Sequence, residues 1–171
     1  LNKYYFINEF KPDHIKKLDK DISIIYRNYK SVHDINLIIK IRDFCKKNRR
    51  NFYLANNMKL AIKCKLNGAY IPSFNKDLKH LNYKTKPNFS IIGSAHNLKE
   101  IRIKEAQNVS KIFISSIFKL KKNYLGFYKF KNLSKNTKKK VIALGGINNN
   151  NLKKIELLNI DGFAGIGYFN Q

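Results

Sequence analysis

Acidic residues, cysteines and long apolar runs are scarce in this sequence of 171 residues, and each shortage narrows the class of protein. The two cysteines, Cys45 and Cys64, fall within predicted helices and do not have the spacing of metal ligands. We therefore expect reduced thiols in the core of a cytoplasmic protein. No apolar run reaches the ~18 residues of a membrane-spanning helix, so no membrane partner is expected. The first ten residues, LNKYYFINEF, also lack the apolar centre of a secretory signal.

The shortage of acidic residues leaves a net charge of +24, from 35 lysines and arginines against 11 acidic residues. Such a surplus would usually indicate nucleic-acid binding. The lysines, however, are spread over nearly every predicted helix and loop, which fits a general bias in composition. Charge alone supports only non-specific attraction to polyanions. We therefore do not expect specific nucleic-acid binding, and small anionic molecules are the ligands that this charge favours.

Apolar segments typical of strands alternate with helical periodicity along the whole chain. The eight predicted strands cover residues 3–10, 22–29, 51–57, 68–74, 89–96, 111–118, 141–144 and 160–168. This alternation implies parallel strands joined by right-handed crossovers. We predict one domain over residues 1–171, with the α/β fold of a (β/α)₈ TIM barrel.

The chain is short for such a barrel, which usually has ~200 residues or more. It ends at Gln171, directly after the eighth predicted strand. We therefore expect a compact barrel that lacks its eighth helix. Two arrangements remain open: a partner subunit in a homodimer covers this face, or the barrel is incomplete.

Polar residues and glycines recur where the predicted strands end. They are Arg27, Asn56, Asn57, Ser94, His96, Gly145 and Gly146. Barrel enzymes place their active sites at the carboxyl ends of the strands. An arginine there needs an anion, because burying an unpaired charge is costly. Ser94 fits either an anion donor or the cap of the helix that follows. The other histidines, His14, His33 and His80, are expected to face solvent.

The most informative stretch is KVIALGGINNNN, residues 140–151. An apolar strand runs directly into Gly145 and Gly146, and four asparagines able to cap a helix follow. Backbone N–H groups at such a junction can bind phosphate, and no side chain blocks the approach at glycine. A tight turn without a ligand explains the same residues. On this stretch alone, both interpretations stay open.

Three segments together resemble the thiamine phosphate synthase and thiazole tautomerase family. They are IIGSAH at 91–96, KIFISSIF at 111–118 and VIALGGINNNNLKKIELLNIDGFAGIG at 141–167. The family fold is a TIM barrel, in agreement with the strand count. The resemblance implies a transferase that joins hydroxymethylpyrimidine pyrophosphate to a thiazole phosphate, with Mg²⁺ and basic groups assisting the loss of pyrophosphate.

The resemblance also assigns roles to individual residues. Arg27 and Ser94 are expected to be catalytic, acting on the pyrophosphate. The expected substrate-binding residues are Asn56, Lys122, Gly145, Gly146, Ile166 and Gly167, the last four around the thiazole phosphate. Asp77 lies near the place of a metal-binding aspartate and is the expected Mg²⁺ ligand.

The sequence departs from the family pattern at several of these places. Asn57 stands where the family has an aspartate on Mg²⁺, which removes charge that attracts the metal. Tyr29 stands where a lysine grips the pyrophosphate, with Lys30 one position away. Lysines 121 and 122 replace a threonine-rich loop as a source of charge. Ser116 takes the place of the catalytic histidine of the tautomerases.

Three functions follow from this pattern. The first is a synthase-type transferase with a depleted metal and pyrophosphate site. The second is a non-catalytic protein that binds thiazole phosphate or thiamine phosphate. The third is a protein similar to the tautomerases.

Overall fold

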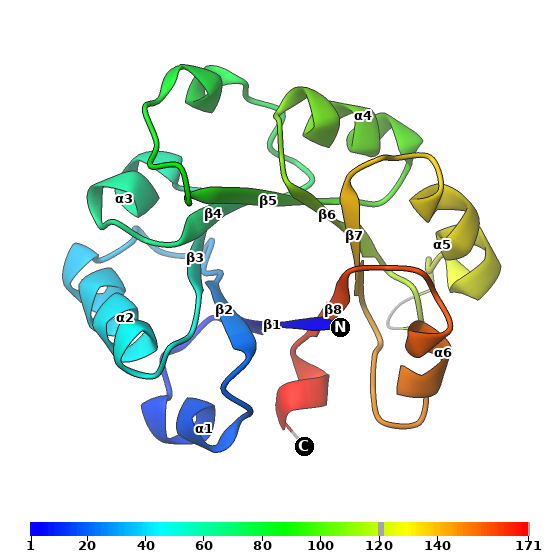
Figure 1. The fold of residues 1–171 in the computed structure, drawn as a ribbon, viewed down its shortest axis with the longest axis horizontal. Helices are drawn as coiled ribbons and strands as arrows, with labels where there is room; N and C mark the ends of the chain where they lie inside the picture. Colours follow the sequence, from blue (N-terminus) through cyan, green and yellow to red (C-terminus); the bar gives the residue numbers. More distant parts are fainter. Residues whose placement is uncertain (120–121, 171) are drawn as a thin grey trace.

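A computed structural model describes residues 1–119 and 122–170, which form a closed barrel of eight parallel strands (Figure 1). The strands are β1 (Asn2–Ile7), β2 (Ile22–Tyr26), β3 (Phe52–Ala55), β4 (Gly68–Ile71), β5 (Ser90–Ala95), β6 (Lys111–Ser115), β7 (Lys140–Leu144) and β8 (Gly162–Gly165). Each strand pairs in parallel with the next, and β8 pairs with β1 to close the barrel. The predicted TIM barrel is confirmed.

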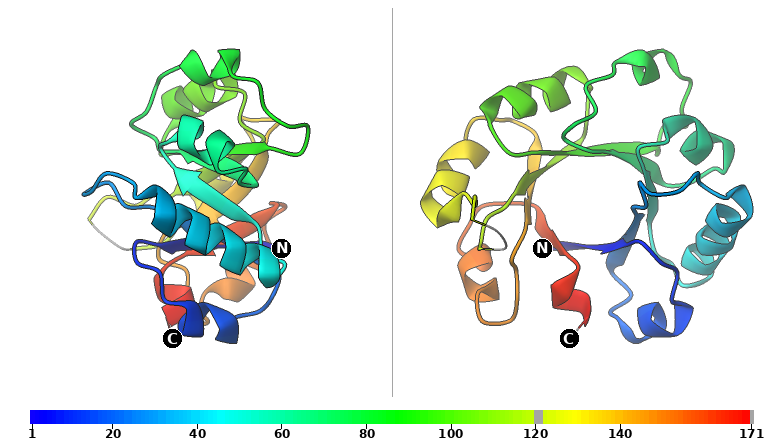
Figure 2. Two further views of the ribbon diagram at one scale, coloured as in Figure 1. Left: turned by 90° about the vertical axis from the view of Figure 1, so that its left-hand side faces the viewer. Right: turned by 180° about the vertical axis from the view of Figure 1, so that it is seen from behind.

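Helices surround this barrel, as both rotated views show (Figure 2). They are α1 (Pro12–Lys17), α2 (Ile35–Lys47), α3 (Met58–Lys63), α4 (Leu98–Ala106), α5 (Gly126–Ser134) and α6 (Leu152–Glu156). A 3₁₀ turn, η1 (Lys79–Asn82), takes the place of a helix between β4 and β5, and a second, η2 (Gly167–Asn170), follows β8. None of the helices in the described residues is long and apolar enough to cross a membrane.

After β8, η2 lies between α6 and α1 (Figures 1 and 2, red). Phe169 is buried there and its ring stacks on Phe163, with 6.2 Å between the ring centroids. The Tyr5 hydroxyl also donates a hydrogen bond to Asn170. The chain therefore lacks an eighth α-helix in the described residues, as expected, and aromatic packing takes over part of its role. The homodimer stays a prediction.

Most strands are shorter than predicted. β2 ends at Tyr26 rather than at residue 29, and β8 spans four residues rather than 160–168. The predicted strands extended too far because apolar residues beyond the hydrogen-bonded strands still pack on the core. Tyr168, for example, lies in η2 and packs edge-on against Phe163. β4 ends immediately before Pro72, as expected for a residue with no N–H to donate.

Side chains fill the barrel interior, so it is a packed core rather than a channel. Phe113 lies at its centre, with ring centroids 5.0 Å from Tyr4, 5.7 Å from Tyr70 and 6.1 Å from Phe6. Alternate residues of each strand point outward against the helices and form the larger apolar cluster. The interior rings lie beneath the carboxyl ends of the strands. Phe6 belongs to these rings and also lines the cavity at that end.

Cys45 and Cys64 are free and buried, as predicted, and burial raises the pKa of the Cys45 thiol to about 12. The histidine prediction was wrong for His80. Its ring is buried and lies 2.8 Å from the backbone oxygen of Gln107, because η1 folds back onto the end of α4. His14 and His33 are also partly buried.

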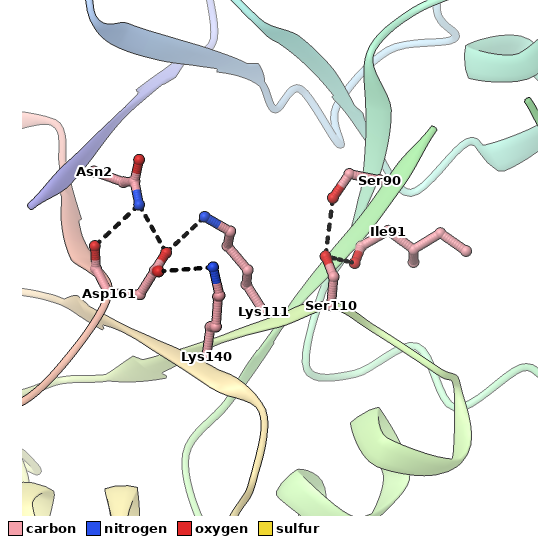
Figure 3. A network of polar contacts seen from close by, with 7 residues as sticks. All are labelled: Asn2, Ser90, Ile91, Ser110, Lys111, Lys140 and Asp161. Atoms are coloured by element: carbon pink, nitrogen blue, oxygen red, sulfur yellow. Dashed lines mark hydrogen bonds and ion pairs between the residues drawn. The ribbon is translucent and has the colours of Figure 1, made fainter. Parts of the chain in front are cut away.

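The amino-terminal ends of the strands are joined by a network around Asp161, just before β8 (Figure 3). Its carboxylate lies 2.6 Å from the Lys111 ammonium and 3.4 Å from that of Lys140, and it accepts a hydrogen bond from Asn2. Burial alone would raise the pKa of Asp161, but Lys111, Asn2 and Lys140 outweigh it and hold the pKa below its ordinary value. This end of the barrel is closed by charges that satisfy one another.

Candidate functional site

A cavity of about 900 Å³ opens at the opposite, carboxyl end of the strands. We call it the mouth cavity. The predicted residues that line it are Arg27, Lys122, Gly145, Gly146, Ile166 and Gly167. Its volume lies within the range of small-molecule sites. The structure thus brings six of the nine predicted site residues to one cavity, whereas Asn56, Asp77 and Ser94 do not line it.

The Gly145–Gly146 turn forms one wall, and its geometry requires glycine. The φ angles are +103° and +70°, a left-handed conformation that other residues rarely adopt. A Cβ atom at Gly145 would lie 2.1 Å from the Ser116 hydroxyl, and one at Gly146 would lie 2.9 Å from the Phe118 backbone. The turn geometry alone therefore accounts for glycine at both positions. With no side chains there, the backbone of the turn lines the cavity directly.

The asparagines after this turn have different roles, and Asn151 holds the loop. The Asn151 side chain donates to the Gly146 carbonyl at 2.8 Å and accepts from the Asn148 N–H at 2.9 Å, and makes no capping bond to α6. The expectation of a cap is therefore corrected for Asn151, whereas the Asn148 side-chain oxygen does accept from the N–H groups of Asn150 and Asn151, at 3.0 and 3.2 Å, in the turn that leads into α6. With only five residues, α6 also offers little dipole. Any phosphate site here depends on the turn itself and on nearby cations.

Arg27 follows β2 and provides a cation at the cavity wall. Its guanidinium carbon lies 4.6 Å from the centroid of the Phe6 ring, which supports it from below. Lys122 contributes a second cation to the lining. No aspartate or glutamate lines the cavity within residues 1–119 and 122–170. The mouth cavity is therefore electropositive and suited to an anion.

Tyr70 is a member of the site that the sequence did not reveal. Burial raises the pKa of its hydroxyl, and that hydroxyl interacts with the side chains of both Ser94 and Arg27. Ser94 is buried on β5 behind this tyrosine rather than at the cavity wall. The two residues predicted to be catalytic are thus linked through Tyr70, which reads in the sequence as an ordinary strand aromatic.

His96 and Ser116 also line the cavity, and both side chains are held by neighbours. His96 Nδ1 lies 2.9 Å from Glu100 Oε2, whose carboxylate also accepts the His96 backbone N–H. The Ser116 hydroxyl donates to the Phe118 carbonyl at 2.9 Å. A hydroxyl engaged in this way gives no support to proton transfer of the tautomerase type.

The residues at the expected Mg²⁺ position do not fit a metal ion. Asn57 is the N-cap of α3, where its side-chain oxygen accepts from the Leu60 N–H at 3.1 Å. Asp77 accepts from the Lys79 N–H at 2.7 Å and faces the Lys79 ammonium at 3.8 Å. In the described part of the chain, no three His, Cys, Asp or Glu side chains gather in a way that would hold a metal.

Comparison with known proteins gives a consistent result. A family model described as thiamine monophosphate synthase matches residues 21–169. A thiamine-phosphate synthase of Methanococcus vannielii is 26% identical over 117 residues, which are 66% of this chain and 56% of that protein. One of Methanococcus maripaludis is 30% identical over 82 residues, 46% of this chain and 40% of that protein. The chain therefore spans about half the length of the curated relatives it matches.

Solved structures support the fold. A thiamine phosphate pyrophosphorylase from Pyrococcus furiosus superposes with a TM-score of 0.74 at 18% identity, covering 97% of this chain and 86% of that chain. FabK from Thermotoga maritima reaches the same TM-score at 11% identity, with 97% of this chain and 58% of that one covered. Similarity at this level shows the barrel alone.

Proposed function

The chain belongs to the thiamine monophosphate synthase family, and we propose that it is a transferase that joins hydroxymethylpyrimidine pyrophosphate to thiazole phosphate. The observation that carries this proposal is the electropositive mouth cavity, in which Arg27 and Lys122 share the walls with the bare Gly145–Gly146 turn. Both proposed substrates are anions and small enough for about 900 Å³.

In this proposal the thiazole phosphate rests against the Gly145–Gly146 turn and the backbone of Ile166 and Gly167. The pyrophosphate lies at Arg27. The bond between the pyrimidine methylene and pyrophosphate breaks, and the thiazole nitrogen forms the new bond to that methylene carbon. Negative charge develops on the leaving pyrophosphate, and cations placed in advance stabilise it. In this proposal Tyr70 and Ser94 act through Arg27, because the buried Tyr70 hydroxyl interacts with the side chains of Ser94 and Arg27.

The direct test is to incubate the protein with both substrates, with Mg²⁺ in one series and with EDTA in another, and to look for thiamine phosphate by chromatography. We expect product, and we expect Arg27→Met to slow its formation by ~100-fold or more, as for other groups that stabilise charge in a transition state. Absence of product in both series would contradict the transferase.

A second candidate, a non-catalytic binder of thiamine phosphate or thiazole phosphate, is favoured by one observation. The family resemblance implies two carboxylates around a metal. An amide replaces one of them at Asn57, and the other, Asp77, is engaged by a hydrogen bond within its own loop. A binder would be stabilised against heat by thiamine phosphate and yet form no product from the two substrates.

Gly167 offers the cleanest way to block the phosphate. A Cβ atom there would meet nothing within 4 Å, and its φ angle lies outside the left-handed region, so a side chain fits without strain. Gly167→Asp adds a carboxylate to the cavity wall, and Gly167→Asn adds the same shape without charge. We expect the aspartate variant to lose the thermal stabilisation by thiamine phosphate and the asparagine variant to keep most of it. Equal behaviour of the two would show that the phosphate lies elsewhere.

A further inference from the structure

We propose that the mouth cavity binds the pyrophosphate group without a divalent cation, and that protein cations alone neutralise it. This rests on the proposed function, since it concerns the same cavity. It differs from what the family resemblance implies, namely Mg²⁺ at the ends of β3 and β4. Three features support this: the oxygen donors at those strand ends, the buried Lys104 ammonium bound to the loop after β4, and the charge of the cavity itself.

The strand ends offer amides where a divalent cation needs carboxylates. Besides Asn57 at the cap of α3, the pair Asn56 and Asn75 lies at this rim, and the Asn75 amide donates to the Asn56 side-chain oxygen at 2.7 Å. The other oxygen, that of Asn75, accepts from the Asp77 N–H at 2.8 Å. Mg²⁺ sites in proteins use one or two carboxylates together with substrate phosphates. Here both amide oxygens are already engaged, and neither carries charge.

The rim also carries an aromatic pair. Tyr29 packs edge-on against Phe74, with 5.3 Å between the ring centroids, and both side chains are about half exposed. Tyr29 occupies the place that the family resemblance gives to a pyrophosphate lysine. The Tyr29–Phe74 pair therefore offers no charged ligand to a metal ion on this side of the mouth.

A lysine ammonium already uses the backbone oxygens of the loop after β4. Lys104, on α4, is fully buried, and its ammonium donates to the carbonyls of Pro72 and Asn75 at 2.8 Å each. A third bond of 2.7 Å goes to the Gln107 side-chain oxygen. These are hard oxygen donors of the kind that Mg²⁺ would take. A monovalent cation that belongs to the protein holds them instead, and its charge repels a divalent ion nearby.

The cavity itself is positive. Arg27 and Lys122 line it without an aspartate or glutamate among the described lining residues. A free Mg²⁺ ion is repelled by such a wall. Pyrophosphate without Mg²⁺ carries more negative charge than its Mg²⁺ complex, so it binds this wall at least as well. The sign of the Mg²⁺ effect on affinity therefore separates a metal-free site from a metal-assisted one.

The experiment is a calorimetric titration of inorganic pyrophosphate into the whole chain, at constant ionic strength, with EDTA or with excess Mg²⁺. We expect binding in EDTA with an affinity equal to or higher than that in Mg²⁺. A higher affinity in Mg²⁺, or no binding in EDTA, would overturn the proposal.

Two variants locate the binding. Arg27→Met should weaken pyrophosphate binding in EDTA by ~10-fold or more, the loss expected when a charged partner is removed. Lys47→Met removes the same charge at the exposed C-terminal end of α2, away from the mouth, and should leave the affinity unchanged. Equal losses in both would mean that pyrophosphate binds non-specifically to a basic surface, which also overturns the proposal.

Failure of this inference is distinguishable from failure of the transferase. Thiamine phosphate formed only in Mg²⁺, with pyrophosphate binding also dependent on Mg²⁺, would confirm the transferase and refute the metal-free site. Metal-free binding of pyrophosphate without product would support the site and refute the transferase.

Discussion

Basic side chains have acidic partners at one end of the barrel and lack them in the cavity at the other end. At the amino-terminal end, Lys111 and Lys140 surround Asp161, and each charge has a partner. At the carboxyl-terminal end, Arg27 and Lys122 line a cavity to which the described residues contribute no acidic side chain. The surplus of basic residues is spread over the whole chain, and at the mouth it lines a cavity without an acidic partner among the described lining residues. We expect an anion to neutralise the mouth, whereas Asp161 serves the lysines of the other end.

This difference fits the general division of labour in such barrels, in which the amino-terminal face supports stability and the carboxyl-terminal face carries function. It predicts that changes to charges that are paired or hydrogen-bonded within the protein alter unfolding, and that changes to the cations of the mouth cavity alter ligand binding. The experiments below test this separation from the largest expected effect to the smallest.

Lys104→Met is expected to have the largest effect, because it removes three hydrogen bonds from one buried ammonium. The Gln107 side-chain oxygen loses its donor, while the Pro72 carbonyl keeps the Asn75 N–H and the Asn75 carbonyl keeps the Gln107 amide. The free energy of unfolding should fall by about 3 kcal/mol, from the loss of hydrogen bonds to a charged donor and from one buried oxygen left unpaired. Chemical denaturation measures it. A loss below ~1 kcal/mol would contradict the role of Lys104 as the support of this loop.

The cost of Lys104→Met should also depend on pH. Burial lowers the pKa of the Lys104 ammonium from 10.5 to about 8, so the unfolded chain binds more protons between these values. Stability of the wild type therefore rises relative to the variant as pH increases from 8 towards 10.5. A cost that stays constant or falls over this interval would contradict the buried position of the charge.

Asp161→Asn should act on stability and leave the mouth unchanged. Lys111 and Lys140 would lose their shared carboxylate, which is partly exposed, and the free energy of unfolding should fall by about 2 kcal/mol. Because the pKa of Asp161 is held below its ordinary value, its contribution is present above pH ~4 and is lost as the pH falls through the folded-state pKa. Weaker pyrophosphate binding in this variant, without a change in stability, would break the proposed separation.

Arg27→Met is the counterpart at the other end. Its stability should change by less than ~0.5 kcal/mol, as for a side chain outside the core contacts, while pyrophosphate binding falls by ~10-fold, which is ~1.4 kcal/mol. Denaturation and calorimetry on the same sample measure both. A large loss of stability with intact binding would mean that Arg27 supports the fold rather than the ligand.

Asn75→Asp should have the smallest effect and the most specific one. The aspartate can still accept the Asp77 N–H, and the Asn56 amide can turn to donate to it. The added carboxylate should weaken pyrophosphate binding in EDTA by ~3-fold and make Mg²⁺ more favourable than in the wild type. Asn132→Asp, on the exposed surface of α5, adds the same charge as a control. An unchanged Mg²⁺ effect would contradict the inference that missing carboxylates exclude the metal.

The sequence was enough to predict the barrel, because regular alternation of strands and helices leaves few other topologies. It also predicted the Gly145–Gly146 turn and Arg27 at the cavity, since both follow directly from the ends of buried strands. Strand ends were less predictable, because apolar residues such as Tyr168 leave the ladder and still pack on the core.

The roles of several residues could not be recognised from the sequence around them. Lys104 reads as a surface lysine of a helix, and its partner Pro72 lies 32 positions away. Tyr70 and Asn75 act through contacts between different strand ends, which no periodicity reveals. Ser94 lies at the predicted strand end but behind Tyr70 rather than in the cavity. Lys121, predicted as an alternative source of charge, lies outside the described residues.

The central claim is that the carboxyl end of the barrel takes the phosphate of a thiamine precursor or product. A crystal structure of the chain grown with thiamine phosphate tests it most directly. We expect the phosphate between the Gly145–Gly146 turn and Gly167. A phosphate bound to the exposed lysines outside the barrel, with the mouth cavity free of ligand, would contradict the account.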